Sequence, residues 1–517
     1  MKRLAILSIL LATATALAAT KASNVTQHHI TWTFDKEHKI GQFVNGDWWV
    51  IGPVNIVAIT NDLSDMKFAD PETPEVSGSM VNPVVDRTNI HTETNQGYDE
   101  RHQNYHTELN AAMPNGKPVS KDNPLHLAHA SSLVSTVSWL WRSETEKEEG
   151  APRIPAPGKH MRPVLRAAAV LTVVDKAPPE GSFRPAYAGT EKRMFNVSQL
   201  RLDRLGKLDP VEGVTNEMAE GKYPALDYGM LVKGASLPQF TYALSHLWLD
   251  HIPHWYGGEA YHPSLNMPNY GREMSRILSN AMLALHLDWE KVEGGSPQPD
   301  KKPLVINLVQ LGIDLAGIAD ANGFWVEDGG HAAGRKPTIL FAGLLLDDAH
   351  MKNVGHWDTS FQDNTQVFYV SEDDIERTGS ENWKVARNVK KAPYTKEMIG
   401  MPEWSFGQVR QGPLGNAAWD IPYRAINYSY IVPFALAMQM FEDGRKLFNR
   451  EAYFDYADRV MSGDGSLGRY GGSYDSIPAF PAKMWEAYRK NYPTTYDAKK
   501  WDDQKILDHI LNATVEE

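Results

Sequence analysis

Residues 304–346 read LVINLVQLGIDLAGIADANGFWVEDGGHAAGRKPTILFAGLLL. Two apolar runs, 304–321 and 338–346, stand on either side of a loop that is rich in glycine and charge. The pair Asn322-Gly323 after the first run is a helix stop signal. Both runs are apolar on nearly every side, and a helix of this kind has to be covered on every side. The stretch therefore predicts two helices buried inside a layered helical domain.

The chain after about His251 keeps this helical character. Apolar residues between Met274 and Leu285 recur at the i, i+3, i+4 and i+7 spacing of an amphipathic helix. Three further helical stretches are expected at 424–441, 451–461 and 481–489. Inner helices wrapped by outer ones predict an α/α toroid over residues 248–517, a fold whose open end forms a long cleft.

The preceding part of the chain has a different pattern. Short runs rich in β-branched and aromatic residues are separated by Pro, Gly and Asn, and such runs are typical of strands. The clearest of them are 29–34, 48–51, 54–59, 132–139 and 164–174. Many short strands with frequent turns predict an antiparallel β-sandwich over residues 19–247. The whole chain is thus expected to be an α+β multidomain protein, with the sandwich before the toroid.

The first residues predict export from the cell. Met1-Lys2-Arg3 is followed by an apolar run to Leu11 and by small residues that end at Ala18. This order is that of a secretory signal peptide, here residues 1–18, cleaved after Ala18. The apolar run is well short of the about 20 residues that span a bilayer. We therefore expect a periplasmic or secreted bacterial protein, with no membrane span after signal removal.

Composition excludes several classes of function. The 517 residues carry 52 Lys and Arg against 64 Asp and Glu, and this net charge of −12 argues against nucleic acid as a partner. The absence of cysteine excludes disulfides, Cys-ligated zinc and thiol catalysis. No phosphate-binding loop and no GxSxG elbow occur. The 15 Trp and 21 Tyr residues provide many rings that suit the faces of sugars.

The loop between the two buried helices is the densest cluster of chemical groups. It places Glu327, Asp328, His331, Arg335 and Lys336 among four glycines. Glycine permits unusual backbone angles and close approach by a ligand, and the flanking helices would hold the loop rigid. In the alternative interpretation the acids pair with the two cations, the histidine caps a helix, and the loop is only a turn.

A second cluster covers residues 250–272. Three histidines, three tyrosines, two asparagines and an arginine lie within these 23 positions. Aromatic faces stack on sugar rings, and Asn, His and Arg side chains bind hydroxyl or carboxylate groups. The alternative is an ordinary crossover between domains. His251 and His254 are close enough in sequence to share a structural metal ion, completed by Asp250 or His262. No other cofactor is expected.

With the signal peptide, the toroid and the Gly-Gly-His-x-x-x-Arg-Lys loop, the chain resembles secreted bacterial polysaccharide-degrading proteins. It is similar to the α/α-toroid polysaccharide lyases of the heparinase and alginate-lyase kind. Many of those lyases place the toroid before the sandwich, whereas the order here is also found in toroid glycoside hydrolases. The resemblance implies cleavage of an anionic polysaccharide by β-elimination.

The leading hypothesis is a lyase that acts on a uronate-containing polysaccharide. β-Elimination removes the proton at C5, next to the carboxylate, so the site has to neutralise that carboxylate and present a base. His331 is the candidate base, and Tyr261 or Tyr270 is the candidate acid for the leaving oxygen. The candidates for substrate binding are Arg272, Asn266, Asn269, Arg335, Lys336, Trp255 and Trp325.

Two other functions remain open on the sequence alone. A toroid glycoside hydrolase would use a pair of carboxylates, one of them protonated at the working pH. The candidates for that pair are Glu327, Asp328 and Asp420. A non-catalytic glycan-binding protein of the cell envelope would use the aromatic rings to bind sugar and would move no proton.

Overall fold

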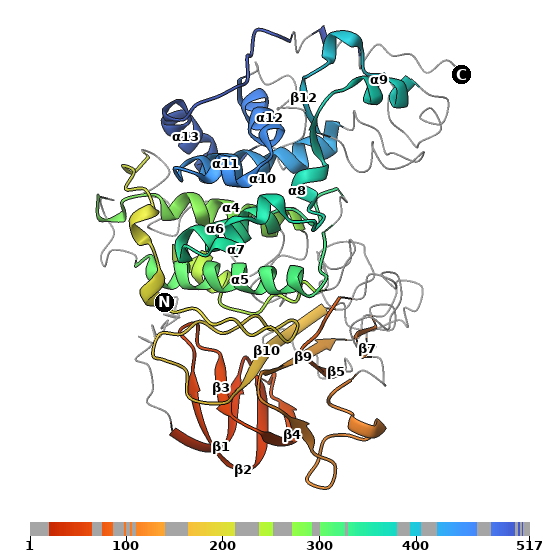
Figure 1. Ribbon diagram of the computed structural model, residues 1–517, viewed down its shortest axis with the longest axis vertical. Helices are drawn as coiled ribbons and strands as arrows, with labels where there is room; N and C mark the ends of the chain where they lie inside the picture. The colour runs from red at the N-terminus through yellow and green to blue at the C-terminus, as the bar shows by residue number, and fades with distance from the viewer. Residues whose placement is uncertain are drawn as a thin grey trace, which may run out of the picture.

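The computed structural model describes the following residues: 20–64, 75–85, 98–99, 104–105, 110–139, 164–211, 237–251, 271–291, 300–325, 329–379, 393–404, 421–462, 477–501, 505–506 and 509. The predicted signal peptide lies outside these ranges. Figure 1 shows a curled sheet at one end of the molecule and layers of helices beyond it. The N-terminal half is therefore mainly β and the C-terminal half mainly α, as the change of sequence pattern predicts.

One mixed sheet makes up most of the β half, beside a short two-stranded sheet of β6 (Tyr98–Asp99) and β7 (Asn104–Tyr105). Its eight strands are β1 Thr20–Gln27, β2 Ile30–Gln42, β3 Trp48–Ile51, β4 Val54–Asn61, β5 Glu75–Val81, β8 Leu125–Leu127, β9 Ser131–Trp139 and β10 Val164–Val174. Across the sheet they follow the order β5-β9-β10-β3-β2-β4-β8, and β1 pairs with β2. The β10 and β3 strands run parallel, and the other described pairs of this sheet are antiparallel. The five strands that the sequence predicts are confirmed.

Strand β10 shows why the predicted antiparallel sandwich is wrong. Leu171 and Val173 of β10 pack into a core that the curled sheet encloses with its own residues, among them Trp32. Ala168 and Val170, on the opposite face of β10, belong to the core of the helical half. One face of the curled sheet encloses a core of its own, and helices cover the opposite face of the sheet. Period-2 alternation revealed the buried faces of the strands but not what covers them.

Eleven α-helices are described. They are α2 Leu237–Ala243, α4 Gly271–Leu285, α5 Lys302–Asp320, α6 Arg335–Leu346, α7 Ala349–Lys352, α8 Gln362–Thr365, α9 Glu372–Gly379, α10 Ile421–Gln439, α11 Gly444–Phe448, α12 Glu451–Ser462 and α13 Ala479–Tyr488. All six predicted helices are confirmed, as α4, α5, α6, α10, α12 and α13, with boundaries within three residues of the predicted ones. A two-stranded sheet of β11 (Val367–Tyr369) and β12 (Pro402–Trp404) lies in the same half. The toroid remains a prediction.

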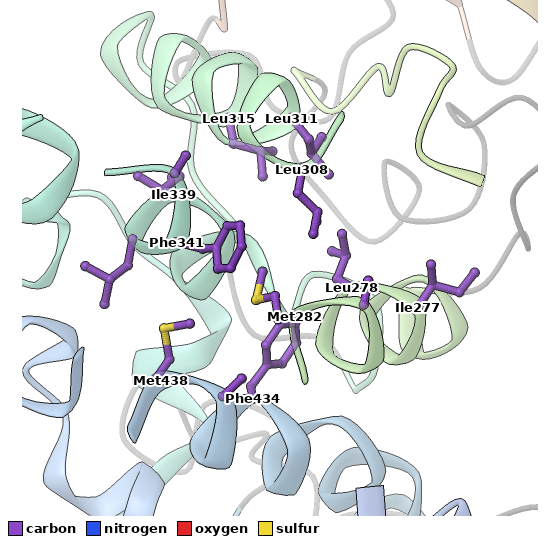
Figure 2. Packing of buried hydrophobic residues seen from close by; sticks show 14 of the residues in the cluster. Ile277, Leu278, Met282, Leu308, Leu311, Leu315, Ile339, Phe341, Phe434 and Met438 are labelled. Carbon is purple, nitrogen blue, oxygen red and sulfur yellow. The ribbon is translucent and has the colours of Figure 1, made fainter. Parts of the chain in front are cut away.

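The helical core is built on the two all-apolar helices. All twelve residues of α6 are buried, and α5 packs directly against it. A Cβ on Gly312 of α5 would lie 2.3 Å from the Cβ of Ala342 in α6, so glycine lets the two helices approach closely. Side chains from four helices meet in this core (Figure 2). Those labelled are Ile277, Leu278 and Met282 from α4, Leu308, Leu311 and Leu315 from α5, Ile339 and Phe341 from α6, and Phe434 and Met438 from α10.

Helix α5 has the length and composition of a membrane span. It is the one such helix among the described residues, and 78% of the segment concerned is buried within the protein. Its position between the sheet and the other helices (Figure 1) accounts for this apolar composition, because both sides of the helix are covered.

A buried arginine joins the β half to α5. The Arg184 guanidinium donates from Nη1 to Oδ1 of Asp314 at 2.9 Å and also bonds the carboxylate of Asp47, next to β3. Gln310 exchanges two hydrogen bonds of 3.0 Å with the backbone of Arg184. The Arg184 side chain is 1% exposed, so removal of either carboxylate would leave a buried charge short of partners. This ion pair fixes the position of the sheet on the helical core.

The boundary between domains is less sharp than the predicted one at residue 247. The sheet ends at Val174, and Phe183 and Tyr187 already pack in the helical core. Helix α2 also lies before the predicted boundary. The segment after β10 therefore contributes to the helical half.

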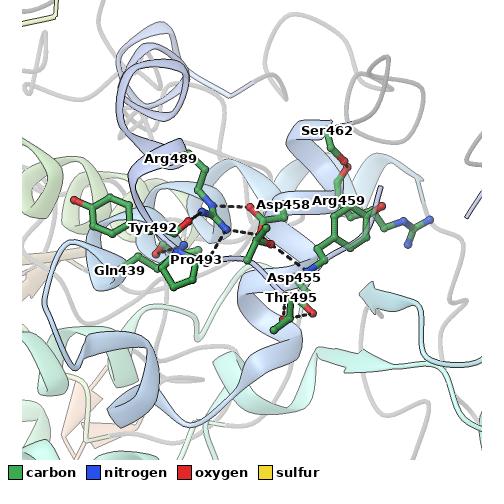
Figure 3. Close-up of polar contacts among 12 residues, drawn as sticks. Gln439, Asp455, Asp458, Arg459, Ser462, Arg489, Tyr492, Pro493 and Thr495 are labelled. Carbon is green, nitrogen blue, oxygen red and sulfur yellow. Dashed lines mark hydrogen bonds and ion pairs between the residues drawn. The ribbon is translucent and has the colours of Figure 1, made fainter. Parts of the chain in front are cut away.

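Polar contacts hold the C-terminal segment on α12 (Figure 3). Arg489, which follows α13, binds the carboxylate of Asp458 with two hydrogen bonds of 2.6 and 2.5 Å. The hydroxyl of Thr495 donates to Asp455 at 2.7 Å. Because these acids stand on one helix, the two contacts fix α13 and the chain after it as a unit.

Buried histidines make the stability of the fold depend on pH. Burial lowers the pKa of His246, His251 and His286 to about 3, whereas the unfolded chain has an imidazole pKa of about 6.5. Between these values only the unfolded chain takes up the protons, so the free energy of unfolding must fall as the pH falls from about 6.5. Each histidine contributes up to about 1.4 kcal/mol per pH unit.

We expect the urea midpoint to decrease from pH 7 to pH 5. His286→Gln should reduce the pH slope of the free energy of unfolding by up to one proton, because it removes one of these groups. A free energy of unfolding that does not change between pH 7 and pH 5 would contradict the assignment.

Candidate functional site

The structure describes part of the predicted site. The residues His331, Arg272, Arg335, Lys336, Trp325 and His251 are described. The remaining candidates lie outside the described residues: Trp255, Tyr261, Asn266, Asn269, Tyr270, Glu327, Asp328 and Asp420, together with His254. The geometry of the site is therefore built from the first group and from the elements that hold it.

The two clusters of the sequence meet through a buried ion pair. Arg335 at the start of α6 donates from Nε to Oδ2 of Asp250 at 2.7 Å and from Nη2 to Oδ1 at 2.9 Å. The side chains are 1% and 2% exposed. Two parallel hydrogen bonds of this kind fix the relative orientation of the planar groups as well as their distance. Residues 85 positions apart in sequence are thus joined at the candidate site.

The same guanidinium holds the backbone of the loop. Nη1 of Arg335 donates to the carbonyl oxygens of Ala333 at 2.8 Å and His331 at 3.3 Å. Arg335 was predicted to bind a substrate carboxylate, but in the structure it binds Asp250 and the loop carbonyls instead. The physical reason is that α6 begins at Arg335, three residues earlier than predicted, so the side chain lies inside the protein.

Lys336 is also inside the protein and not on an open cleft. Its Nζ atom donates to Oδ1 of Asn364 at 2.5 Å and lies 4.2 Å from the ring centroid of Phe448. Burial lowers the pKa of the Lys336 ammonium to about 7, although Asp363 opposes the shift. These contacts make Lys336 a residue that supports the loop, and its ammonium group is not presented at a surface.

A second contact joins the two clusters at the start of α4. A Cβ on Gly271 would lie 2.1 Å from the carbonyl oxygen of His331 and 2.6 Å from that of Gly330. The first turn of α4, which includes the buried Arg272, therefore packs directly on the backbone of the loop. Both described ends of the 250–272 segment contact the loop, as the hypothesis of a shared site requires.

Helix α8 supports the loop from another side. Gln362 accepts a hydrogen bond from the backbone N–H of Ala332 and donates to the carbonyl oxygen of Gly329, each at 2.9 Å. Asp363 accepts from the N–H of Gly334 at 2.9 Å, so it caps the start of α6. Neither Gln362 nor Asp363 was predicted from the sequence. A helix of four residues shows no periodicity, and nothing in its composition separates it from a surface turn.

Among the described residues of the loop, 329–336, His331 is the one that reaches solvent. Gly329 and Gly330 before it and residues 332–336 after it are buried, whereas His331 is partly exposed. Its Nδ1 atom is buried, so the accessible part of the residue lies elsewhere on it. His331 is thus a partly exposed residue on a backbone that is hydrogen-bonded on two sides.

Trp325 does not offer its face to a ligand. It is 4% exposed and stacks on Phe361 with 5.5 Å between ring centroids. Its backbone N–H donates to the carbonyl oxygen of Ser360 at 2.8 Å. The predicted sugar-binding ring is therefore a packing contact at the base of the loop.

His251 has a hydrogen-bonding role at the edge of the site. Its Nδ1 atom lies 3.2 Å from the hydroxyl of Tyr187, and the same hydroxyl accepts from the backbone N–H of Asp250 at 3.0 Å. Within the described ranges no group of three potential metal ligands occurs. The structure thus offers Tyr187 as the partner of His251.

The two described acids that contact the loop are already engaged. Asp250 is bonded to Arg335, and Asp363 is bonded to the backbone N–H groups of Gly334 and Lys336. Neither acid can take up or release a proton without loss of a structural contact. The arrangement can therefore hold an imidazole in a fixed position, which is the geometry that general acid or base catalysis requires.

The chain was compared with known protein families, with curated proteins and with solved structures, and none of them matches it. Function has to be argued from the residues of the site and their geometry.

The contact at Gly271 gives a direct test of this geometry. We expect Gly271→Ala to lower the free energy of unfolding by about 1–3 kcal/mol or more, because backbone atoms of the loop cannot move away from the new methyl group. Amide exchange of residues 329–336 should become faster. Gly379→Ala in α9 is the control, since nothing lies within 4 Å of a Cβ there. Equal stability of the two variants would show that α4 does not press on the loop.

Proposed function

We propose that the protein is a polysaccharide lyase that cleaves a uronate-containing polymer by β-elimination, with His331 as the base. One observation supports this choice. Of the described titratable side chains at the loop, His331 is partly exposed while the others are buried in contacts within the protein. These others are Asp250, Arg335, Lys336 and Asp363.

An imidazole suits the chemistry of this elimination. The base has to remove the proton at C5 of the uronate, and a group whose unperturbed pKa is about 6.5 serves best near neutral pH. The hydrogen-bonded loop would keep the ring in place during the proton transfer. In this proposal Asn266 keeps its predicted role at the uronate carboxylate, whereas Arg272, in the first turn of α4 beside the loop, is buried like Arg335 and Lys336. Tyr261 and Tyr270 keep their proposed role as the acid.

The preference for a lyase rests on His331, because the carboxylates predicted for a hydrolase, Glu327, Asp328 and Asp420, lie outside the described residues. A hydrolase needs two carboxylates that face the substrate, and the described acids beside the loop, Asp250 and Asp363, are buried and bonded within the protein. The proposal also includes three features that were predicted from the sequence. The helical half would be an α/α toroid, the mature chain would begin after Ala18, and the protein would act in the periplasm or outside the cell.

The test is an activity assay with the mature chain. Purified protein is incubated with a panel of uronate-containing and neutral polysaccharides. A lyase leaves an unsaturated uronate, so we expect new ultraviolet absorbance with at least one anionic polymer. His331→Ala should lower the rate by about 10²–10⁴-fold, the usual loss for a general acid–base group, with little change in melting temperature.

His356→Ala on the exposed turn after α7 is the matched control, and its activity should equal that of the unchanged chain. New reducing ends without unsaturation would transfer the assignment to a hydrolase. Full activity of a folded His331→Ala variant would remove the proposed base. Binding of glycan with no cleavage of any polymer would favour the non-catalytic alternative.

A further inference from the structure

A separate pocket lies on the other side of α5. It has a volume of about 250 Å³ and is lined by the segment 186–195, the C-terminal half of α5 and the start of α7. None of its lining residues belongs to the 329–336 loop. The pocket is therefore distinct from the candidate active site, and nothing in the proposed lyase reaction uses it.

The floor of this pocket is flat and apolar. Ala186, Ala188, Ala316 and Gly317 line it, and no side chain among them extends beyond Cβ. A Cβ on Gly317 would lie 2.1 Å from that of Ala186, so the segment rests directly on α5 and the pocket opens beside this contact. Phe195 adds an apolar wall. A compact ligand with an apolar face would fit such a surface.

The rim of the pocket is polar and carries an excess of negative charge. Nε2 of His350 lies 2.8 Å from Oδ1 of Asp320, so a protonated imidazole offsets at most that one carboxylate. Arg193 is bonded to Asp348, which neutralises the cation. Glu191 is exposed and has no hydrogen bond or ion pair with any described residue. One carboxylate of the rim thus lacks a counter-charge.

The helix beneath the rim adds to this negative potential. Asp320 is the last residue of α5, so the pocket opens at the C-terminal end of a helix of 19 residues. The carbonyl groups of Gly317, Ile318 and Ala319 already accept hydrogen bonds from the backbone of 321–323, so the helix end contributes a weaker partial negative charge than an open one, of the sign that favours a cation. The helix end and the unpaired carboxylate of Glu191 therefore point to the same sign of ligand.

We propose that this pocket binds a small ligand that combines a single ring with an ammonium group. The volume is below the about 300–1,000 Å³ that is typical of pockets for drug-sized ligands, which limits the ligand to about one ring. The apolar face of the ring would lie on the alanine and glycine floor, and the ammonium group would pair with Glu191 and Asp320 at the rim. An amino sugar and a cyclic aliphatic amine share this chemistry.

The test uses matched probes with the same body and different charge. Glucosamine, glucose and glucuronate form one set, and cyclohexylamine, cyclohexanol and cyclohexanecarboxylate form the other. Binding to the mature chain is followed by NMR titration at pH 7. We expect the ammonium member of at least one set to bind about three- to tenfold more tightly than its neutral member, with the carboxylate weakest. Tighter binding of glucosamine than cyclohexylamine would identify a sugar ligand, and the reverse an aliphatic one.

Variants place the binding in this pocket. Glu191→Gln should weaken the ammonium probe about two- to fivefold and leave the neutral probe unchanged. Glu180→Gln is the control, because Glu180 is exposed on the preceding segment and does not line the pocket. Ala316→Phe should abolish binding by filling the floor. Thr190→Trp, at the exposed rim, should also abolish binding, and it does not change the core.

The proposal is overturned if the ammonium probes bind no more tightly than the neutral ones, if no probe binds, or if Glu191→Gln and Thr190→Trp leave binding unchanged. These readouts need no catalytic activity. They therefore stand or fall independently of the lyase assignment.

Discussion

The bidentate ion pair between Asp250 and Arg335 is the contact on which the candidate site depends. It joins two segments that are far apart in sequence, and the remaining guanidinium nitrogen holds two carbonyl groups of the loop. The network also continues to the sheet. The N–H of Asp250 donates to the hydroxyl of Tyr187, whose own N–H donates to Asp314, the partner of Arg184. Because burial makes an unpaired charge costly, each member of this network keeps the next one in place.

Much of the fold follows from local patterns in the chain. The apolar runs of 304–346 predicted α5 and α6, and apolar spacing predicted α4, because a helix or strand records in sequence which of its sides is buried. The same patterns do not record what covers a buried side. Strand β10 was correctly predicted as a strand, but its cover is the curled sheet on one face and helices on the other, so the predicted sandwich is wrong.

The candidate site was predictable in its residue types but not in its contacts. The two clusters stood out because acids, bases and cations gather among glycines, and the structure brings the described parts of both together. Composition cannot show whether a cation faces solvent or an acid of the same chain, so the burial of Arg335 and Lys336 was missed. Gln362 and Asp363 were missed because their side chains bond to backbone groups of the loop. Backbone groups are the same at every residue, so such contacts leave no pattern in the sequence of either segment.

The central claim is that Asp250 and Arg335 couple the two clusters, and a double-mutant cycle measures that coupling directly. The free energy of unfolding is determined for the unchanged chain, for Asp250→Ala, for Arg335→Ala and for the double variant. Loss of one partner of a buried pair should cost about 3–5 kcal/mol, because the other charge remains buried. The double variant should then cost little more than either single change, which gives a coupling of several kcal/mol. Costs that add within about 0.5 kcal/mol would contradict the account, since they would show two residues that act independently.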